Sequence, residues 1–260
     1  MAQNSFFTRI GEDIYVPTIH AEGAWSKEDY HFASLAGLMT HVIEQHRAQH
    51  DGGLLDMSRI SFDILGRLPF QEVAIEVELK RPGRTIELVE STATIGGRTV
   101  IIARAWYLCT SDTSAVEGIE YDTLPAPQDC PERPFNQEWG GGYIAQIEAR
   151  QAVDKRAGRG ATWLTSPNTL VDGDEPIALA EFISRVDAAN GINPRQSPED
   201  WVFPNVDLTI HLFRQPAGEW TGLDTAVTWG AHGIGLTSSV LHDVHGPVGR
   251  AEQSLTVRKT

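Results

Sequence analysis

The sequence has 260 residues, of which 41% are hydrophobic and 22% charged, and its formal net charge is −14. This composition is typical of one or two globular domains with a buried core, and the acidic balance argues against a nucleic-acid-binding surface. No apolar run is long enough to span a membrane, and the first residues lack the pattern of a secretory signal. Because Cys109 and Cys130 make no disulfide framework, we expect a cytoplasmic protein.

The first part of the chain predicts an extended lead, one long helix and four strands. The lead is expected around 14–25 and the helix at about 28–46. Alternating and β-branched residues then favour strands. These strands are expected at 59–65, 72–79, 85–95 and 99–108. Gly96-Gly97 between the last two is typical of a hairpin turn.

The second part predicts the same order of elements after a connector. Residues 111–134 hold four prolines and six acidic residues against one arginine, which indicates an extended surface linker. A glycine-rich turn at 139–143 and an extended lead around 142–152 precede a helix expected at about 175–190. The four strands that follow are expected at 206–213, 222–229, 233–242 and 248–258, with a turn at His245-Gly246.

The two parts also match residue by residue at a constant offset. Leu, Arg, Pro and Glu in L-G-R-L-P-F-Q-E at 65–72 recur in L-F-R-Q-P-A-G-E at 212–219, 147 positions later. The same offset pairs Met39 with Val186 and Gly83 with Gly230. Self-similarity at a fixed spacing indicates an internal duplication. Two copies of a long helix followed by antiparallel strands predict an α+β layer arrangement.

One carboxylate lies on the apolar face of the second predicted helix. Asp187 follows Ile183 by four residues and Leu179 by eight, so it shares their stripe. Asn190-Gly191 reads as the end of this helix, and the helix dipole disfavours a carboxylate in the last turn. A half-exposed carboxylate bonded to a nearby backbone N–H would explain Asp187 as well as a functional group would, although the cost favours function.

Several short motifs resemble the TesB-like acyl-CoA thioesterases. They are K-R-P-G-R at 80–84, I-E-A-R at 147–150, V-D-L-T-I-H-L-F-R-Q-P at 206–216 and A-E-Q-S-L-T-V-R at 251–258. The resemblance covers nearly the whole chain and implies a double hotdog, in which two units pack as a pseudo-dimer. We expect an N-terminal unit at 1–110, an acidic, proline-rich linker at 111–134 and a C-terminal unit at 135–260.

The resemblance also implies three catalytic residues. Asp187 takes the position of the family's helix Asp, and Gln253 takes the position of the Gln on the last strand. Asn205 falls where relatives carry Thr or Ser, and Y-H-F-A-S at 30–34 replaces a glycine pair that many relatives carry. Asp187 would deprotonate a water that Asn205 and Gln253 hold, and backbone N–H groups at a helix start would receive the negative charge.

In the first copy, the offset positions of Asp187 and Asn205 carry Thr40 and Ser58, and Gln253 falls on Tyr107 after a deletion of one residue, as expected for a single active site or for neutral drift. The expected function is hydrolysis of a fatty acyl-CoA, with acyl-CoA as partner, no cofactor or metal, and a homo-oligomer, dimer or tetramer, as assembly. A non-catalytic acyl-CoA binder is the main alternative. A hotdog hydratase is a weaker one, because D-A-A-N-G-I-N-P lacks a histidine at the expected spacing.

Overall fold

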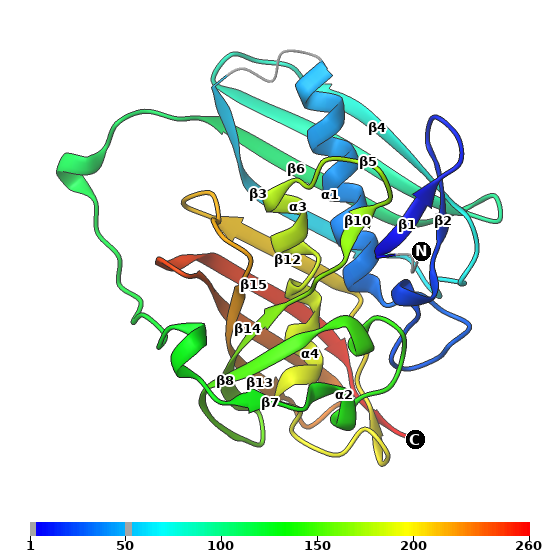
Figure 1. Ribbon diagram of the computed structural model, residues 1–260, viewed down its shortest axis with the longest axis vertical. Coiled ribbons are helices and arrows are strands. Elements are labelled where there is room, and N and C mark those ends of the chain that lie inside the picture. The colour runs from blue at the N-terminus through cyan, green and yellow to red at the C-terminus, as the bar shows by residue number, and fades with distance from the viewer. Residues whose placement is uncertain (1–3, 50–53) are drawn as a thin grey trace.

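The two halves of the chain fold into similar units, each with helices packed on antiparallel strands (Figure 1). The computed structural model describes residues 4–49 and 54–260. The first half contains β1 (Ser5–Arg9), β2 (Ile14–Pro17), the 3-10 turn η1 (Ile19–Ala21), α1 (Phe32–Gln49), β3 (Leu55–Ile64), β4 (Val73–Arg81), β5 (Ile86–Ile95) and β6 (Arg98–Cys109). The connecting segment contains η2 (Ser114–Val116), η3 (Pro127–Asp129), β7 (Glu132–Arg133), α2 (Phe135–Glu138) and η4 (Ile144–Gln146). The second half contains β8 (Glu148–Arg156), β9 (Arg159–Thr165), β10 (Thr169–Val171), α3 (Ala178–Ile183), η5 (Val186–Ala188), α4 (Ala189–Ile192), β11 (Trp201–Val202), β12 (Asp207–Leu212), β13 (Thr221–Trp229), β14 (Ile234–Asp243), β15 (Gly246–Thr256) and β16 (Arg258–Lys259).

Fourteen strands form one sheet in which the second half mirrors the first. Their order is β10-β1-β2-β4-β5-β6-β3-β12-β15-β14-β13-β9-β8-β7, so β3 and β12 join the halves at the centre. These two strands pair in antiparallel fashion, with Ile60 opposite Ile210 and Asp63 opposite Asp207. A pseudo-two-fold axis therefore passes between β3 and β12.

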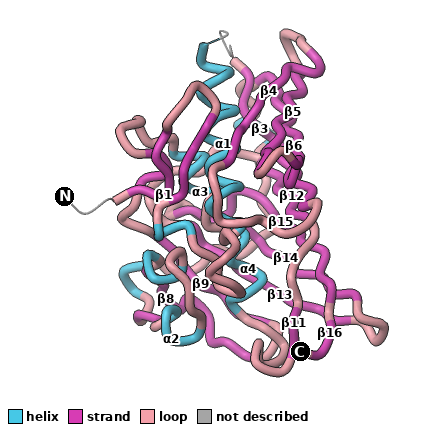
Figure 2. Tube along the Cα trace, turned by 90° about the vertical axis from the view of Figure 1, so that its right-hand side faces the viewer, coloured by secondary structure: helices cyan, strands magenta, loops and turns pink. Residues whose placement is uncertain are grey.

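The sheet curves around the helices. In Figure 2, α1 and α3 lie between β1 and the central strands. α1 is buried almost continuously from Phe32 to Ile43, because it has sheet on several sides and α3 beside it. The predicted α+β architecture of two tandem helix-on-sheet units is confirmed. Among the described helices, none is long and apolar enough to cross a membrane.

The two helices cross at residues that the repeat makes equivalent. A Cβ placed on Gly37 of α1 would lie 2.5 Å from the Cβ of Ser184, which directly follows α3. Gly37 and Ser184 are themselves 147 positions apart, so the crossing lies near the pseudo-two-fold axis. Residue 37 must be glycine because the adjacent segment at Ser184 leaves no room for a side chain.

The prediction of one continuous helix at 175–190 is wrong. α3 ends at Ile183, Arg185 takes φ −110° and ψ −13°, and the chain continues as the short turn η5 and the single helical turn α4. The hydroxyl of Tyr143 donates to the carbonyl of Ser184 at 2.6 Å, which satisfies a group that the break leaves free. Asn190-Gly191 does not end the helix but lies inside α4. Asp187 therefore sits in η5, beyond the break.

The extended segment that was predicted before the helix of each half is one part of a β-hairpin. β1 pairs with β2, and β8 pairs with β9. The glycine-rich turn before β8 brings the leads together: a Cβ on Gly142 would lie 1.8 Å from the carbonyl oxygen of Ile19. The N–H groups of Gly142 and Tyr143 both donate to Glu22, at 3.1 Å each. This contact fixes Tyr143 beside the start of α1.

Candidate active site

Asp187, Asn205 and Gln253, which were predicted from distant parts of the sequence, lie in contact. Oδ1 of Asp187 accepts hydrogen bonds from Nδ2 of Asn205 at 2.9 Å and from Nε2 of Gln253 at 2.8 Å. Asp187 is only 7% exposed. Both amides thus bind one carboxylate oxygen, which leaves Oδ2 for other partners.

Each of the two amides is fixed by its own strand. Asn205 lies just before β12, where it bridges to Leu255 of β15, and its Nδ2 also donates to the carbonyl of Asp207 at 3.1 Å. Gln253 lies within β15 and is 1% exposed. Its Oε1 is buried without a protein partner among the described residues. The amide nitrogens therefore hold the carboxylate, and Oε1 of Gln253 is the atom that remains for a water.

The environment of Asp187 raises its pKa to about 6. Burial is the largest cause, since removing a carboxylate from water disfavours its charged form. Hydrogen bonds from Asn205, Gln253 and the N–H group of Ala33 act in the opposite direction. A carboxylate with such a pKa is largely ionised at neutral pH and still basic enough to accept a proton.

Sequence reasoning missed His31, which lies at the same site. Its Nδ1 is 3.7 Å from Oδ2 of Asp187 and accepts the N–H of Ala33 at 3.3 Å. The ring stacks on Tyr143, with centroids 4.1 Å apart and an interplanar angle of 23°. The only signal in the sequence was the position of His31 near the start of the first helix, which was predicted at about 28–46. Its distance from Asp187 along the chain hid the contact, which the pairing of the two halves creates.

A cavity of about 620 Å³ opens beside Asp187 and His31. Its walls come from both halves and from β11 and β16, which form a separate two-stranded ribbon. Trp25, Trp139 and Phe203 form an aromatic cluster in these walls, with ring centroids 5.0–6.2 Å apart. Such a surface favours an apolar ligand.

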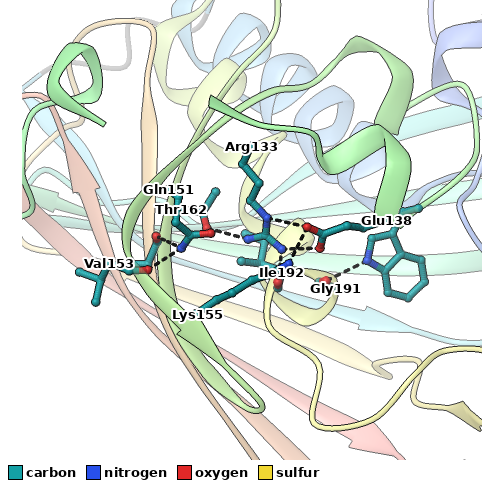
Figure 3. A network of polar contacts seen from close by, with 10 residues as sticks. Arg133, Glu138, Gln151, Val153, Lys155, Thr162, Gly191 and Ile192 are labelled. Atoms are coloured by element: carbon teal, nitrogen blue, oxygen red, sulfur yellow. Dashed lines mark hydrogen bonds and ion pairs between the residues drawn. The ribbon is translucent and has the colours of Figure 1, made fainter. Parts of the chain in front are cut away.

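A polar network around the buried side chain of Arg133 lies next to Trp139 of the cavity wall, and Figure 3 shows Arg133 between Glu138 and Ile192. Arg133 pairs with Glu138 at 2.6 Å and donates to the carbonyl of Ile192. The indole N–H of Trp139 donates to the carbonyl of Gly191 at 2.9 Å. α2 and the end of α4 are thereby fixed together, so the cavity wall is anchored on the same segment that carries Asp187.

The corresponding positions in the first half have structural roles. The hydroxyl of Thr40 donates to the carbonyl of Ala36 at 2.8 Å, within α1. The hydroxyl of Tyr107 donates to Glu44 at 2.5 Å. Within residues 4–49 and 54–260, no cluster of three or more His, Cys, Asp or Glu residues could hold a metal ion.

Both halves match family models of acyl-CoA thioesterases. Residues 21–108 match the N-terminal domain of these enzymes, and residues 127–257 match their C-terminal domain. A comparison with curated protein sequences gave no match.

Solved structures with the same fold cover nearly the whole chain. The TesB protein of Mycobacterium avium subspecies paratuberculosis is 16% identical, with a TM-score of 0.64 over 97% of this chain and 96% of its own. The acyl-CoA thioesterase II TesB2 of Mycobacterium marinum is 15% identical, with a TM-score of 0.64 over 98% and 96%. A hot dog fold protein of unknown function from Alicyclobacillus acidocaldarius is 14% identical, with a TM-score of 0.71 over 96% and 95%. From the two family models it follows that the chain belongs to the acyl-CoA thioesterase family, and with the shared fold of these structures it forms a double hotdog.

Proposed function

We propose that this protein hydrolyses a fatty acyl-CoA thioester to the free acid and CoA, with water as the nucleophile and Asp187 as the general base. The observation that carries the proposal is the state of Asp187. Its carboxylate is buried beside a cavity, two amides hold one of its oxygens, and its pKa is about 6. A base with a pKa near the working pH combines the correct protonation state with a useful driving force.

The proposed reaction needs no serine or cysteine nucleophile. A water held by Oδ2 of Asp187 and Oε1 of Gln253 attacks the carbonyl carbon and forms a C–O bond, while its proton passes to Asp187. The π electrons of the carbonyl move to its oxygen. When the C=O bond re-forms, the C–S bond breaks, and the CoA thiolate leaves and takes the proton from Asp187.

The cavity supports an acyl chain as the part of the substrate that lies inside the protein. Trp25, Trp139 and Phe203 supply apolar walls, and about 620 Å³ is within the usual range for a small-molecule site. Arg67 and Arg258 line the same cavity and are exposed, so they can meet the phosphates of CoA. Arg67 already pairs with Asp29 at 2.9 Å, which makes Arg258 the freer of the two.

The test measures the release of free CoA, by thiol detection, from a panel of short to long acyl-CoAs. The native protein is compared with Asp187→Asn, which has nearly the same shape but cannot act as a base. We expect release from at least one chain length and a loss of about 10³-fold in the variant. No release by the native protein from any chain length would refute the hydrolase and favour a binder.

A hydratase acting on enoyl- or hydroxyacyl-thioesters is the second candidate, and one observation favours it. The sequence lacks a histidine near Asp187 along the chain, but the structure supplies His31 at 3.7 Å. An acid and a base on one substrate are what addition of water to a double bond requires. Incubation with enoyl-CoA distinguishes the two: a hydratase removes the enoyl absorbance without releasing thiol, and a thioesterase releases thiol.

We also propose that the protein forms a homo-oligomer through the sheet face opposite the helices. Trp106 and Leu108 point to that face, because the alternate residues Ala105 and Tyr107 are buried against the helix side. They line a second hollow that crosses β3 and β12 near the pseudo-two-fold axis. Light scattering coupled to size-exclusion chromatography tests this, since a monomeric mass at all concentrations would exclude it.

A further inference from the structure

Two N–H groups at the start of α1, where the oxyanion is expected to bind, are engaged by the protein itself. The N–H of Ala33 donates to Nδ1 of His31 and to the carboxylate of Asp187. The N–H of Ser34 donates to the carbonyl of His31 at 3.1 Å. By resemblance, the stretch Y-H-F-A-S at 30–34 replaces a glycine pair, and side chains there restrict how closely a ligand can approach this backbone. A side-chain donor at the cavity would therefore add to what the helix start can offer an oxyanion.

Three further side-chain donors that line the cavity are held by the protein. Nδ2 of Asn205 donates to Asp187, and Nδ2 of Asn190 donates to the carbonyl of Phe203 at 2.9 Å. The indole N–H of Trp139 donates to Gly191. These three bonds hold the walls of the site in place.

His31 has the orientation that such a side-chain donor requires. Nδ1 accepts the N–H of Ala33, so this nitrogen carries no proton, and the proton of the neutral ring must be on Nε2. Nε2 has no hydrogen-bond partner in the described part of the chain, and His31 is 13% exposed and lines the cavity. The ring is held face to face with Tyr143, whose own hydroxyl is bonded to Ser184. His31 thus brings an N–H donor, on a ring held in place, to the cavity that the proposed base also lines.

We infer that Nε2–H of His31 donates a hydrogen bond to the carbonyl oxygen of the thioester and stabilises the oxyanion that forms when water attacks. The inference rests on the proposed function and adds a catalytic residue to it. Asp187 of the second half activates the water that attacks the carbonyl carbon, and His31 of the first half binds the oxyanion. His31 gives up no proton in this step, so the electron and proton balance of the hydrolysis is unchanged.

The electrostatics of the ring suit this role. The groups that face His31 are Asp187 and Tyr143, and burial lowers the pKa of His31 to about 3. The imidazole is therefore neutral at physiological pH, although a carboxylate lies beside it. A neutral imidazole at a helix N-terminus can polarise a carbonyl without first losing a proton.

Two variants separate this role from the structural roles of His31. His31→Asn keeps a side chain that caps the start of α1. His31→Phe keeps a ring against Tyr143. Both lack a donor at the position of Nε2, so we expect kcat to fall about 10²-fold in both while KM changes less than about threefold, as for loss of one oxyanion donor. Retention of kcat within about fivefold by either variant, with its fold intact by circular dichroism, would overturn the inference.

A spectroscopic measurement reports the hydrogen bond itself. Octanoyl-CoA labelled at the carbonyl carbon is bound to Asp187→Asn, which does not turn over, and its C=O stretch is recorded by infrared difference spectroscopy. We expect a shift to lower frequency than in water, and loss of that shift in Asp187→Asn with His31→Phe. An unchanged band in the double variant would overturn the inference. If the native protein releases no CoA, the proposed function fails, while this band still decides whether His31 contacts a bound thioester.

Discussion

The two sides of the helix crossing have the same architecture but different chemistry. Three residues after Gly37, Thr40 turns its hydroxyl back to its own helix; three residues after Ser184, Asp187 faces the start of the opposite helix. The difference follows from the break after α3, which frees η5 from the helical ladder, whereas α1 continues without a break. The polar group around Asp187 thus forms on one side of a symmetric frame, where the helix is interrupted.

The largest expected effect of this difference is on activity. Asp187→Ala removes the proposed base, so we expect kcat/KM to fall about 10³-fold. Thr40→Val removes the corresponding group on the other side of the crossing and should leave kcat/KM within about twofold. Steady-state CoA release by both variants measures the contrast. Similar losses in the two would show that both sides of the crossing contribute to one site.

The pH dependence tests the amides that hold the base. Since Asp187 must be ionised and its pKa is about 6, kcat/KM should fall about tenfold per pH unit below that value. Gln253→Leu removes a hydrogen bond that favours the ionised form of Asp187. We therefore expect the acidic limb of the pH profile of kcat/KM to move up by about one pH unit, and the maximum kcat/KM to fall about 10–100-fold. Tyr107→Phe, at the corresponding position of the first half, should leave the limb in place. A limb that does not move in Gln253→Leu would contradict the role of this amide.

The crossing itself should be sensitive to size. Gly37→Ala introduces a methyl group 2.5 Å from the Cβ of Ser184 and 2.8 Å from Leu170. We expect the free energy of unfolding to fall by about 2–3 kcal/mol, a typical cost of overpacking. In the linker, a Cβ added at Gly118 meets nothing within 4 Å. Gly118→Ala should therefore change the free energy of unfolding by less than about 0.5 kcal/mol. Denaturant unfolding compares them, and equal values would mean that the helices can move apart at no cost.

The smallest expected effect is an increase in the free energy of unfolding when the buried carboxylate of Asp187 is removed. The pKa of Asp187 is about 6 in the folded protein and about 3.9 in an unfolded chain, so the folded state binds more protons between these values. Stability therefore decreases as the pH rises from about 4 to 6, and the cost persists above. Asp187→Asn should raise the free energy of unfolding by about 1–2 kcal/mol at pH 7.5 and by little at pH 4. Destabilisation at pH 7.5 would show that the charge is better compensated than burial suggests.

The sequence predicts the repeat well because strand patterns and turn residues are local. Gly96-Gly97 and His245-Gly246 do lie at hairpin turns, and Gly37 and Ser184, which are 147 positions apart, meet at the helix crossing. The break after Ile183 was not predictable from periodicity. It depends on Tyr143, which comes from the glycine-rich turn and bonds the carbonyl of Ser184.

The candidate site also depends on contacts between distant segments, which local sequence patterns do not predict. Asp187 was singled out by its place on an apolar stripe, Asn205 and Gln253 came from resemblance, and the structure brings the three together. Their roles remain a proposal, since no local pattern shows that both amides bind the carboxylate. His31 was missed because its partner is 156 residues away in the sequence. A contact created only by the docking of two halves leaves no trace in the spacing of either one.

Because β3 and β12 join two similar units of one polypeptide, substitutions can accumulate in each unit separately. In a homodimer of identical units, every substitution would occur twice, and a change that improved one cleft would alter the other equally. Here the two units are parts of one polypeptide, so Thr40 and Asp187 can be altered independently. Their mutual concentration is also fixed by the chain, so dilution does not separate them. Covalent fusion thus allows one unit to specialise in supplying the base while the other supplies the frame that meets it.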